Sequence, residues 1–143
     1  MAVRFARCCN PVPGDEIIGY VTRGRGVTIH RTDCVNIIQL TEEDRHRLID
    51  ADWEVAPEGK KDLKFISSIQ IFAEDRKGIL MDVSSIVTNE EIMITSMNAR
   101  RTKDTRECVF DLSVEISSKE QLEMLGKKLA QIPGVYDIVR STN

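Results

Sequence analysis

Several features of membrane and secreted proteins are missing from this chain of 143 residues. No run of about 18 apolar residues is present, which is the length that a helix needs to cross a bilayer. The opening residues, Met1-Ala2-Val3-Arg4, lead straight into strand-like sequence without the apolar stretch of a secretory signal peptide. The four cysteines do not resemble a disulfide framework, because two are adjacent and Cys108 stands alone in an apolar strand pattern. We therefore expect a cytoplasmic protein without membrane contact.

The charge is unevenly distributed along the chain, although the composition (41% hydrophobic, 30% charged) is that of an ordinary globular protein. Residues 1–38 hold five arginines and three acidic residues, whereas the other 105 residues hold 15 basic and 20 acidic side chains. The planar guanidinium group suits contacts with phosphate. These arginines are therefore either a solvated surface or a phosphate-binding patch: Arg4, Arg7, Arg23, Arg25 and Arg31.

Three of the four cysteines and one of the two histidines lie within a window of 27 residues: Cys8, Cys9, His30 and Cys34. Thiolates and an imidazole are the usual ligands of a tetrahedral zinc ion. Adjacent side chains of a strand point to opposite faces, so the backbone must bend at Cys8-Cys9 if both thiols are to reach one metal. Pro11 and Pro13 favour such a bend, because proline breaks the hydrogen bonding of a strand. The alternative is a group of buried thiols beside an ordinary histidine, without metal.

Residues 1–55 have the pattern of a small β-rich domain. Short strands are expected at 3–6, 17–22, 27–30 and 48–53, with a glycine turn at 23–26. A short helix should begin near Cys34, capped by Thr32 or Asp33, with Val35, Ile37 and Ile38 facing inward. A second helix should begin at Thr41. So few residues bury little apolar area, which makes such a domain marginal without a metal. The polar segment 56–64 should be a linker.

Residues 65–143 change to longer elements in the order βαββαβ, the ferredoxin-like arrangement. Strands are expected near 65–73, 92–101, 108–116 and 135–140, and helices follow Gly78 and Ser118. Helices on one face leave the opposite sheet face or its edges uncovered. A homodimer through this domain is therefore expected, and polar residues on the open face favour pairing at an edge: Ser67, Gln70, Thr95, Ser113 and Glu115.

A resemblance to a known family rests on about 30 positions without gaps. They begin Cys8-Cys9-Asn10-Pro11-x-Pro13-Gly14-Asp15 and end Ile29-His30-Arg31-x-Asp33-Cys34-x-Asn36. This stretch resembles the zinc-finger or RIS domain of long RelA/SpoT-type enzymes, which make or hydrolyse the alarmone (p)ppGpp. The second half resembles the ACT domain that follows it in the family, through Asp75-Arg76-x-Gly78-Ile79-Leu80 and Gly134-Val135-x-x-Ile138-x-Arg140.

The resemblance implies a regulatory role without catalysis in this chain. The histidines are only His30 and His46, too few for the family's His/Asp hydrolase centre, and no Gly-Lys-[Ser/Thr] phosphate loop occurs. We expect the chain to be the C-terminal regulatory end of such an enzyme, coupling ribosome and uncharged-tRNA signals to the absent catalytic half. The first domain of the family docks near the ribosomal A site, which implies RNA contact by the five arginines.

ACT domains commonly bind amino acids where the first strand meets the first helix. The resemblance therefore implies a ligand site, in which Asp75 would receive an ammonium group and apolar side chains favour a branched-chain amino acid. Its residues would be Asp75, Arg76, Gly78, Ile79, Leu80, Ile92 and Met93. The alternative is that these residues serve only turn, cap and core.

Two other functions stay open. One is a free-standing, zinc-stabilised RNA-binding module with an ACT dimerisation domain. The other is a thiol redox catalyst at Cys8-Cys9, which we rank last because adjacent cysteines lack the Cys-x-x-Cys spacing of thiol oxidoreductases.

Overall fold

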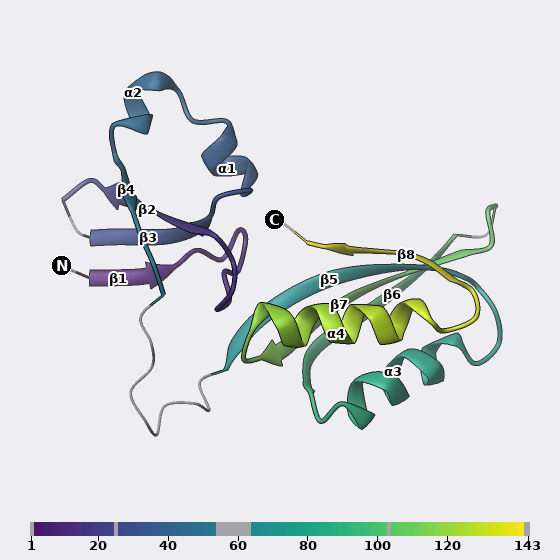
Figure 1. The fold of residues 1–143 in the computed structure, drawn as a ribbon. Helices are drawn as coiled ribbons and strands as arrows, with labels where there is room; N and C mark the ends of the chain where they lie inside the picture. The colour runs from purple at the N-terminus through teal and green to yellow at the C-terminus, as the bar shows by residue number, and fades with distance from the viewer. Residues whose placement is uncertain (1, 25, 54–63, 103, 142–143) are drawn as a thin grey trace.

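The computed structural model describes residues 2–24, 26–53, 64–102 and 104–141 (Figure 1). Within them the chain forms two four-stranded sheets, one from each half of the sequence. The predicted linker 56–64 lies outside the described residues except for Lys64. No described helix combines the length and the apolar character that crossing a membrane requires.

The N-terminal sheet has the strand order β1-β3-β2-β4. Strand β1 runs parallel to β3, whereas the other neighbours are antiparallel. The elements are β1 (Ala2–Phe5), β2 (Ile17–Thr22), β3 (Gly26–Arg31), α1 (Val35–Ile38), α2 (Glu42–Arg45) and β4 (Leu48–Asp50). Both helices are single turns, so this half of the molecule holds little regular structure besides its sheet.

The short helices correct part of the sequence-based prediction. Because α1 has only four residues, only Ile37 is buried, while Val35 and Ile38 are exposed rather than inward. Neither Thr32 nor Asp33 caps it, since the N-cap position belongs to Cys34 and makes no side-chain bond. The predicted start of α2 is confirmed, because the Thr41 hydroxyl accepts a hydrogen bond from the Asp44 N–H.

The C-terminal half has the predicted βαββαβ order, with strand order β6-β7-β5-β8. Its elements are β5 (Phe65–Glu74), α3 (Ile79–Asn89), β6 (Met93–Thr102), β7 (Glu107–Ile116), α4 (Lys119–Ala130) and β8 (Val135–Arg140). Helices α3 and α4 lie together on one face of this sheet (Figure 1). The apolar residues that recur at strand and helix spacing form the core between them, including Ile71, Val83, Phe110 and Leu125.

The opposite face of this sheet holds most of the polar residues that the sequence predicts there, together with the apolar Phe72, Val109 and Val139. Ser68 and Ser113 hydroxyls lie 2.8 Å apart, and the Gln70 amide donates to Asp111 at 2.9 Å. Ser67 was assigned to this face, but it is fully buried on the helix side. The alternation explains the correction, because Ser67 shares the phase of the core residue Ile69.

Candidate metal centre and ligand cavity

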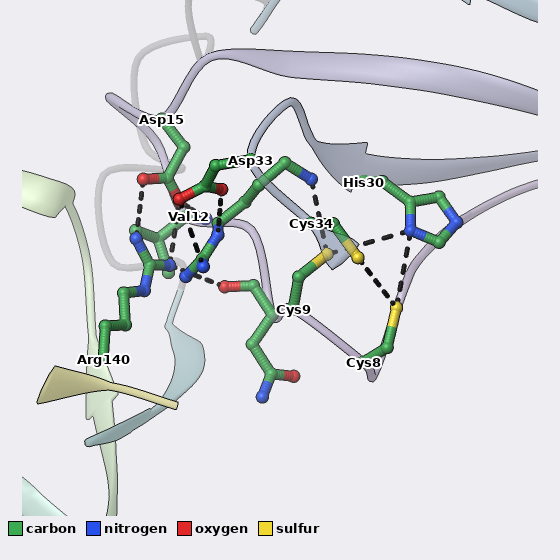
Figure 2. A network of polar contacts seen from close by, with 10 residues as sticks. Cys8, Cys9, Val12, Asp15, His30, Asp33, Cys34 and Arg140 are labelled. Carbon is green, nitrogen blue, oxygen red and sulfur yellow. Dashed lines mark hydrogen bonds and ion pairs between the residues drawn. The ribbon is translucent and has the colours of Figure 1, made fainter. Parts of the chain in front are cut away.

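Four side chains from three segments of the N-terminal half converge on one point (Figure 2). The donor atoms of Cys8, Cys9, His30 and Cys34 all lie within 4.8 Å of one another. Cys8 Sγ is 3.4 Å from His30 Nδ1 and 3.5 Å from Cys34 Sγ, and Cys9 Sγ is 3.8 Å from His30 Nδ1. The structure thus brings together all four residues that the sequence singles out, and it identifies Nδ1 as the imidazole atom that faces the thiols.

The adjacent cysteines reach the same point because they lie in a turn. The Asn10 N–H donates to the Ala6 carbonyl at 3.0 Å, which closes a tight turn around residues 7–9 immediately after β1. Asn10 itself adopts a positive φ of 46°, a conformation that asparagine tolerates better than most residues. The bend that the sequence requires is therefore present, and Ala6 and Asn10 form it rather than the prolines that follow.

The spacing of these donor atoms matches tetrahedral zinc coordination. With Zn–S bonds near 2.3 Å and a Zn–N bond near 2.0–2.1 Å, tetrahedral ligands lie about 3.8 Å (S···S) and about 3.6 Å (S···N) apart. Three of the six donor separations, at 3.4 to 3.8 Å, fall around these values, and all six are within 4.8 Å. Three thiols with one imidazole also suit zinc, whereas magnesium and calcium bind oxygen ligands instead. The residues present therefore fit a metal ion.

Burial shapes the protonation of these ligands. Burial is the main reason that the pKa of Cys9 rises to about 12, although the Arg31 N–H, 3.3 Å from its sulfur, opposes that rise. Burial also lowers the pKa of His30, which keeps the imidazole neutral and able to bind a metal. A bound cation favours the thiolate, because it compensates the charge that burial disfavours.

A second candidate site is a cavity of about 270 Å³ between the end of β5, the start of α3 and the middle of the sheet. Five of the seven predicted ligand-binding residues line it: Asp75, Arg76, Gly78, Ile79 and Leu80. Gly78 has a φ of +88°, so the left-handed conformation that begins α3 favours glycine there. The structure thus brings five of the seven residues together at one cavity.

The remaining two predicted ligand-binding residues are not part of this cavity. Ile92 is buried in the core and Met93 is exposed at the start of β6, whereas Ala99, Arg101, Cys108 and Phe110 complete the cavity wall. The sequence misplaced Ile92 and Met93 because only the pairing of β6 with β7 decides which residues of β6 reach the helix start.

The electrostatics of the cavity also differ from the prediction. Asp75 was expected to receive an ammonium group, but its carboxylate accepts two hydrogen bonds from Arg101 Nε, at 3.1 and 3.0 Å. Arg76 is held by Asp82 at 2.6 Å and donates to the Pro133 carbonyl. The exposed Arg101 guanidinium therefore stands at the cavity as a group able to face an anion such as a carboxylate.

Known protein families match both halves of this chain. The family model of the RelA/SpoT RIS domain matches residues 1–54, and that of the ACT domain matches residues 61–140. The chain belongs to the ACT domain family and opens with a RelA/SpoT RIS domain. The resemblance seen in the sequence is thus confirmed.

Relatives with both domains carry the name GTP pyrophosphokinase. The protein of Escherichia coli K12 is 34% identical over 136 residues, 95% of this chain and 18% of the relative. That of Streptomyces coelicolor is 38% identical over 141 residues, 99% of this chain and 16% of the relative. The chain therefore spans less than a fifth of these relatives. The ACT domain from GTP pyrophosphokinase of Chlorobium tepidum, solved by NMR, shares the fold (TM-score 0.50, 22% identity, 56% of this chain and 89% of that chain).

The arginines of the RIS domain do not all face the solvent. Arg4, Arg7 and Arg23 are exposed, and Arg25 lies outside the described residues. Arg31 is only 4% exposed and pairs with Asp33 at 2.8 Å, so it does not belong to a surface patch. Its position on β3, with its backbone N–H on Cys9, makes it part of the surroundings of the metal centre instead.

One further arginine lies near the exposed group. Arg47 Nη1 donates to the Val21 carbonyl at 3.4 Å, which places it against β2 close to Arg23. Arg47 is not among the arginines that the sequence singles out, and the antiparallel pairing of β4 with β2 is what brings it there.

Proposed function

We propose that this chain is a non-catalytic regulatory segment of a RelA/SpoT-type GTP pyrophosphokinase. The observation that carries the proposal is the pairing of a RIS domain with an ACT domain in a chain that matches 16–18% of relatives bearing that name. The catalytic half then belongs to the remainder of the parent enzyme. In this role the RIS domain receives signals from the ribosome and its uncharged A-site tRNA, and the ACT domain receives amino-acid signals.

Within this function, zinc bound by Cys8, Cys9, His30 and Cys34 holds the RIS domain together. The fit of the four donor atoms to tetrahedral coordination supports this assignment. Four protein ligands complete the coordination sphere of a structural site and leave no position for a catalytic water. Bound zinc therefore supplies a cross-link between three segments of the chain and no reaction chemistry.

The exposed arginines of the RIS domain form the proposed RNA contact. Arg4 lies on β1 beside Thr28, Arg23 occupies the turn before β3, and Arg7 lies in the turn that carries the cysteines. Guanidinium groups of this kind contact phosphate oxygens without reading sequence. The proposed partners are ribosomal RNA and the A-site tRNA.

Ribosome binding at several salt concentrations tests the RNA contact. We expect Arg4→Glu combined with Arg23→Glu to weaken binding at least tenfold and to flatten its salt dependence, because about two phosphate contacts are lost. Arg106→Glu is the matched control, an exposed arginine of the ACT domain. If the RIS double variant binds ribosomes as the control does, the RNA assignment is wrong.

The ACT cavity is the proposed site of a branched-chain amino acid. The apolar wall of Ile79, Leu80 and Phe110 suits an aliphatic side chain, and Arg101 suits a carboxylate. Titration with valine, leucine or isoleucine should shift the backbone amide resonances of residues 76–80. The amides of residues 120–124, far along the chain on α4, serve as the internal control. Shifts that are absent, or equal in both groups, would contradict ligand binding there.

Pairing of ACT domains into a homodimer is also part of the proposal. Strands β6 and β8 are the edges of the sheet, and each has unpaired backbone groups along its outer side. Sedimentation of the full chain should give the mass of a dimer. A monomer at concentrations of tens of micromolar would speak against this part of the proposal.

A further inference from the structure

The segment 10–15, which we call the docking loop, leaves the metal centre and packs against the ACT domain. It follows directly after Cys9 and precedes β2. Val12, at its middle, has no exposed surface and belongs to the apolar cluster built otherwise from ACT residues. A side chain of the RIS domain thus completes the core of its neighbour.

One guanidinium group holds both ends of the docking loop. Arg140, the last residue of β8, donates to the Asp15 carboxylate through Nη1 at 2.7 Å and Nη2 at 2.9 Å. Its Nη2 also donates to the Asn10 carbonyl at 2.8 Å. Asp15 in turn accepts from the Val12 N–H at 2.8 Å, so the loop is bonded to itself as well as to Arg140. Figure 2 shows this ion pair beside the cysteine cluster.

The start of α4 and the sole tryptophan complete the joint. The Lys119 N–H, which has no partner within α4 because it lies in the first turn, donates to the Pro13 carbonyl at 2.7 Å. Gly14 lies so close to Lys119 that an added Cβ would stand 2.9 Å from the lysine Cβ, and its φ is +106°. The Trp53 indole donates to the Asp15 carbonyl at 3.0 Å and stacks on Phe5.

The metal centre and the joint share backbone on both sides. Cys9 and Asn10 are consecutive, so the position of the Asn10 carbonyl that Arg140 binds depends on where Cys9 is held. On the other side, Arg31 places its N–H on Cys9 Sγ. Burial raises the pKa of Asp15, the bonds from Arg140 and the Val12 N–H lower it below its ordinary value, and the charge of Arg31 adds a smaller effect in the same direction. If Cys8 and Cys9 are no longer held by a metal, the docking loop is therefore less fixed at Asn10, the end at which its carbonyl accepts from Arg140.

We propose that the docking loop couples metal binding in the RIS domain to docking of the ACT domain. A filled centre holds residues 10–15 in the conformation that Arg140 and the start of α4 accept, and a vacated centre releases the ACT domain. The inference rests on the proposed zinc site. Coupling of this kind is reciprocal, so docking must also strengthen metal binding by the same factor.

Zinc affinity of the full chain, measured by competition with a chromophoric chelator, tests the reciprocal half of the coupling. We expect Arg140→Gln, which removes the docking ion pair but no metal ligand, to weaken zinc binding about fivefold or more. Lys128→Gln is the matched control, because it breaks another ion pair of the ACT domain, with Glu90, at the end of α4 opposite to Lys119. It should bind zinc as the unchanged chain does.

Hydrogen exchange of the unchanged chain tests the other half and needs no variant. Removing zinc with a chelator should speed exchange of the Lys119 amide at least tenfold, while the Leu125 amide, in the middle of the same helix, keeps its rate. Unchanged Lys119 exchange overturns the coupling.

The results also separate the coupling from the zinc site on which it rests. One zinc per chain with equal affinity in both variants overturns the coupling alone. A chain that binds no zinc overturns the metal proposal and the coupling together.

Discussion

The RIS and ACT domains have sheets with the same number of strands but cores of very different size. Among the described residues, the ACT cluster holds seventeen buried apolar residues, whereas the RIS cluster holds four. Two of those four are Cys9 and Cys34, both candidate metal ligands. One of the seventeen, Val12, belongs to the RIS part of the sequence. The smaller domain thus contributes a side chain to the larger core, although its own buried cluster is much smaller.

The comparison shows two ways of stabilising a sheet of four strands. The ACT sheet is covered by two helices of 11 and 12 residues, and the apolar area buried between them supplies its stability. The RIS sheet faces two helical turns of four residues each, too short to bury a comparable area. A structural metal commonly substitutes for the missing core in domains of this size.

The largest effect is expected from removing one metal ligand. Because structural zinc contributes about 10–16 kcal/mol of apparent free energy to folding in small domains, Cys34→Ala should unfold the RIS domain while the ACT domain stays folded. Amide spectra of the full chain should lose the dispersed RIS resonances only. Zinc content, measured on the same sample, should fall from one ion per chain to none.

Cys108→Ala is the control for this prediction. Cys108 is 3% exposed and lies in the ACT core, so its loss removes a buried sulfur without touching the metal centre. Zinc content and RIS resonances should be retained. Equal loss of RIS structure in both variants would show that cysteine removal acts in some way other than through the metal.

The reverse experiment weakens the larger core. Leu125 has no exposed surface, and Leu125→Ala should lower the free energy of unfolding of the ACT domain by about 2–5 kcal/mol, because a cavity remains. Denaturant unfolding, followed by ACT amide intensities, measures it. Met124→Ala, its exposed neighbour on α4, should change the stability by less than about 0.5 kcal/mol. The zinc content should be unaffected by either change.

The sequence predicted elements that depend on local pattern and missed features that depend on pairing between distant segments. Alternation at period two and helical spacing placed the ACT strands and helices, and clustering of cysteines with His30 identified the four side chains whose donor atoms converge. The burial of Arg31, in contrast, is a tertiary effect: its backbone N–H lies on Cys9 Sγ and its charge acts on Asp15, and neither residue is near it in the sequence.

The joint between the domains was missed altogether. Its ion pair joins Asp15 to Arg140, 125 residues apart, and no periodicity in a single sequence connects such positions. Val12 stood between two prolines, where the sequence suggested only a break in a strand. Asp15 and Arg140 were both visible in the motifs that carry the family resemblance, but a motif does not say which other residue each of its residues contacts.

Removing the Asp15–Arg140 ion pair should lower the free energy of unfolding by an intermediate amount that depends on pH. Burial alone raises the pKa of Asp15, but hydrogen bonds from Arg140 and the Val12 N–H outweigh it, so the pKa lies below its ordinary value. The stabilisation is therefore complete above the unfolded-state pKa, about 4, and is lost as the pH falls through the lower folded-state pKa. Asp15→Asn should cost about 1.5–3 kcal/mol at pH 7.

Unfolding by denaturant at several pH values checks this prediction. The difference between the unchanged chain and Asp15→Asn should be constant from pH 7 to about pH 5 and should shrink below about pH 4. A difference that grows on acidification would have the wrong sign and would exclude a charged Asp15 as the stabilising form.

The smallest effect is expected from Val12→Ala, which tests whether a residue of the RIS sequence stabilises the core of the ACT domain. Val12→Ala removes about two buried methylene equivalents, which corresponds to about 1.6 kcal/mol. Val12 belongs to the RIS sequence, yet it packs in the ACT cluster, so this loss should appear in the unfolding of the ACT domain. Val35→Ala, an equal truncation at an exposed RIS position, should leave both domains unchanged. Residue-resolved unfolding by NMR distinguishes the two, and a Val12→Ala effect confined to RIS amides would mean that the docked arrangement does not persist in solution.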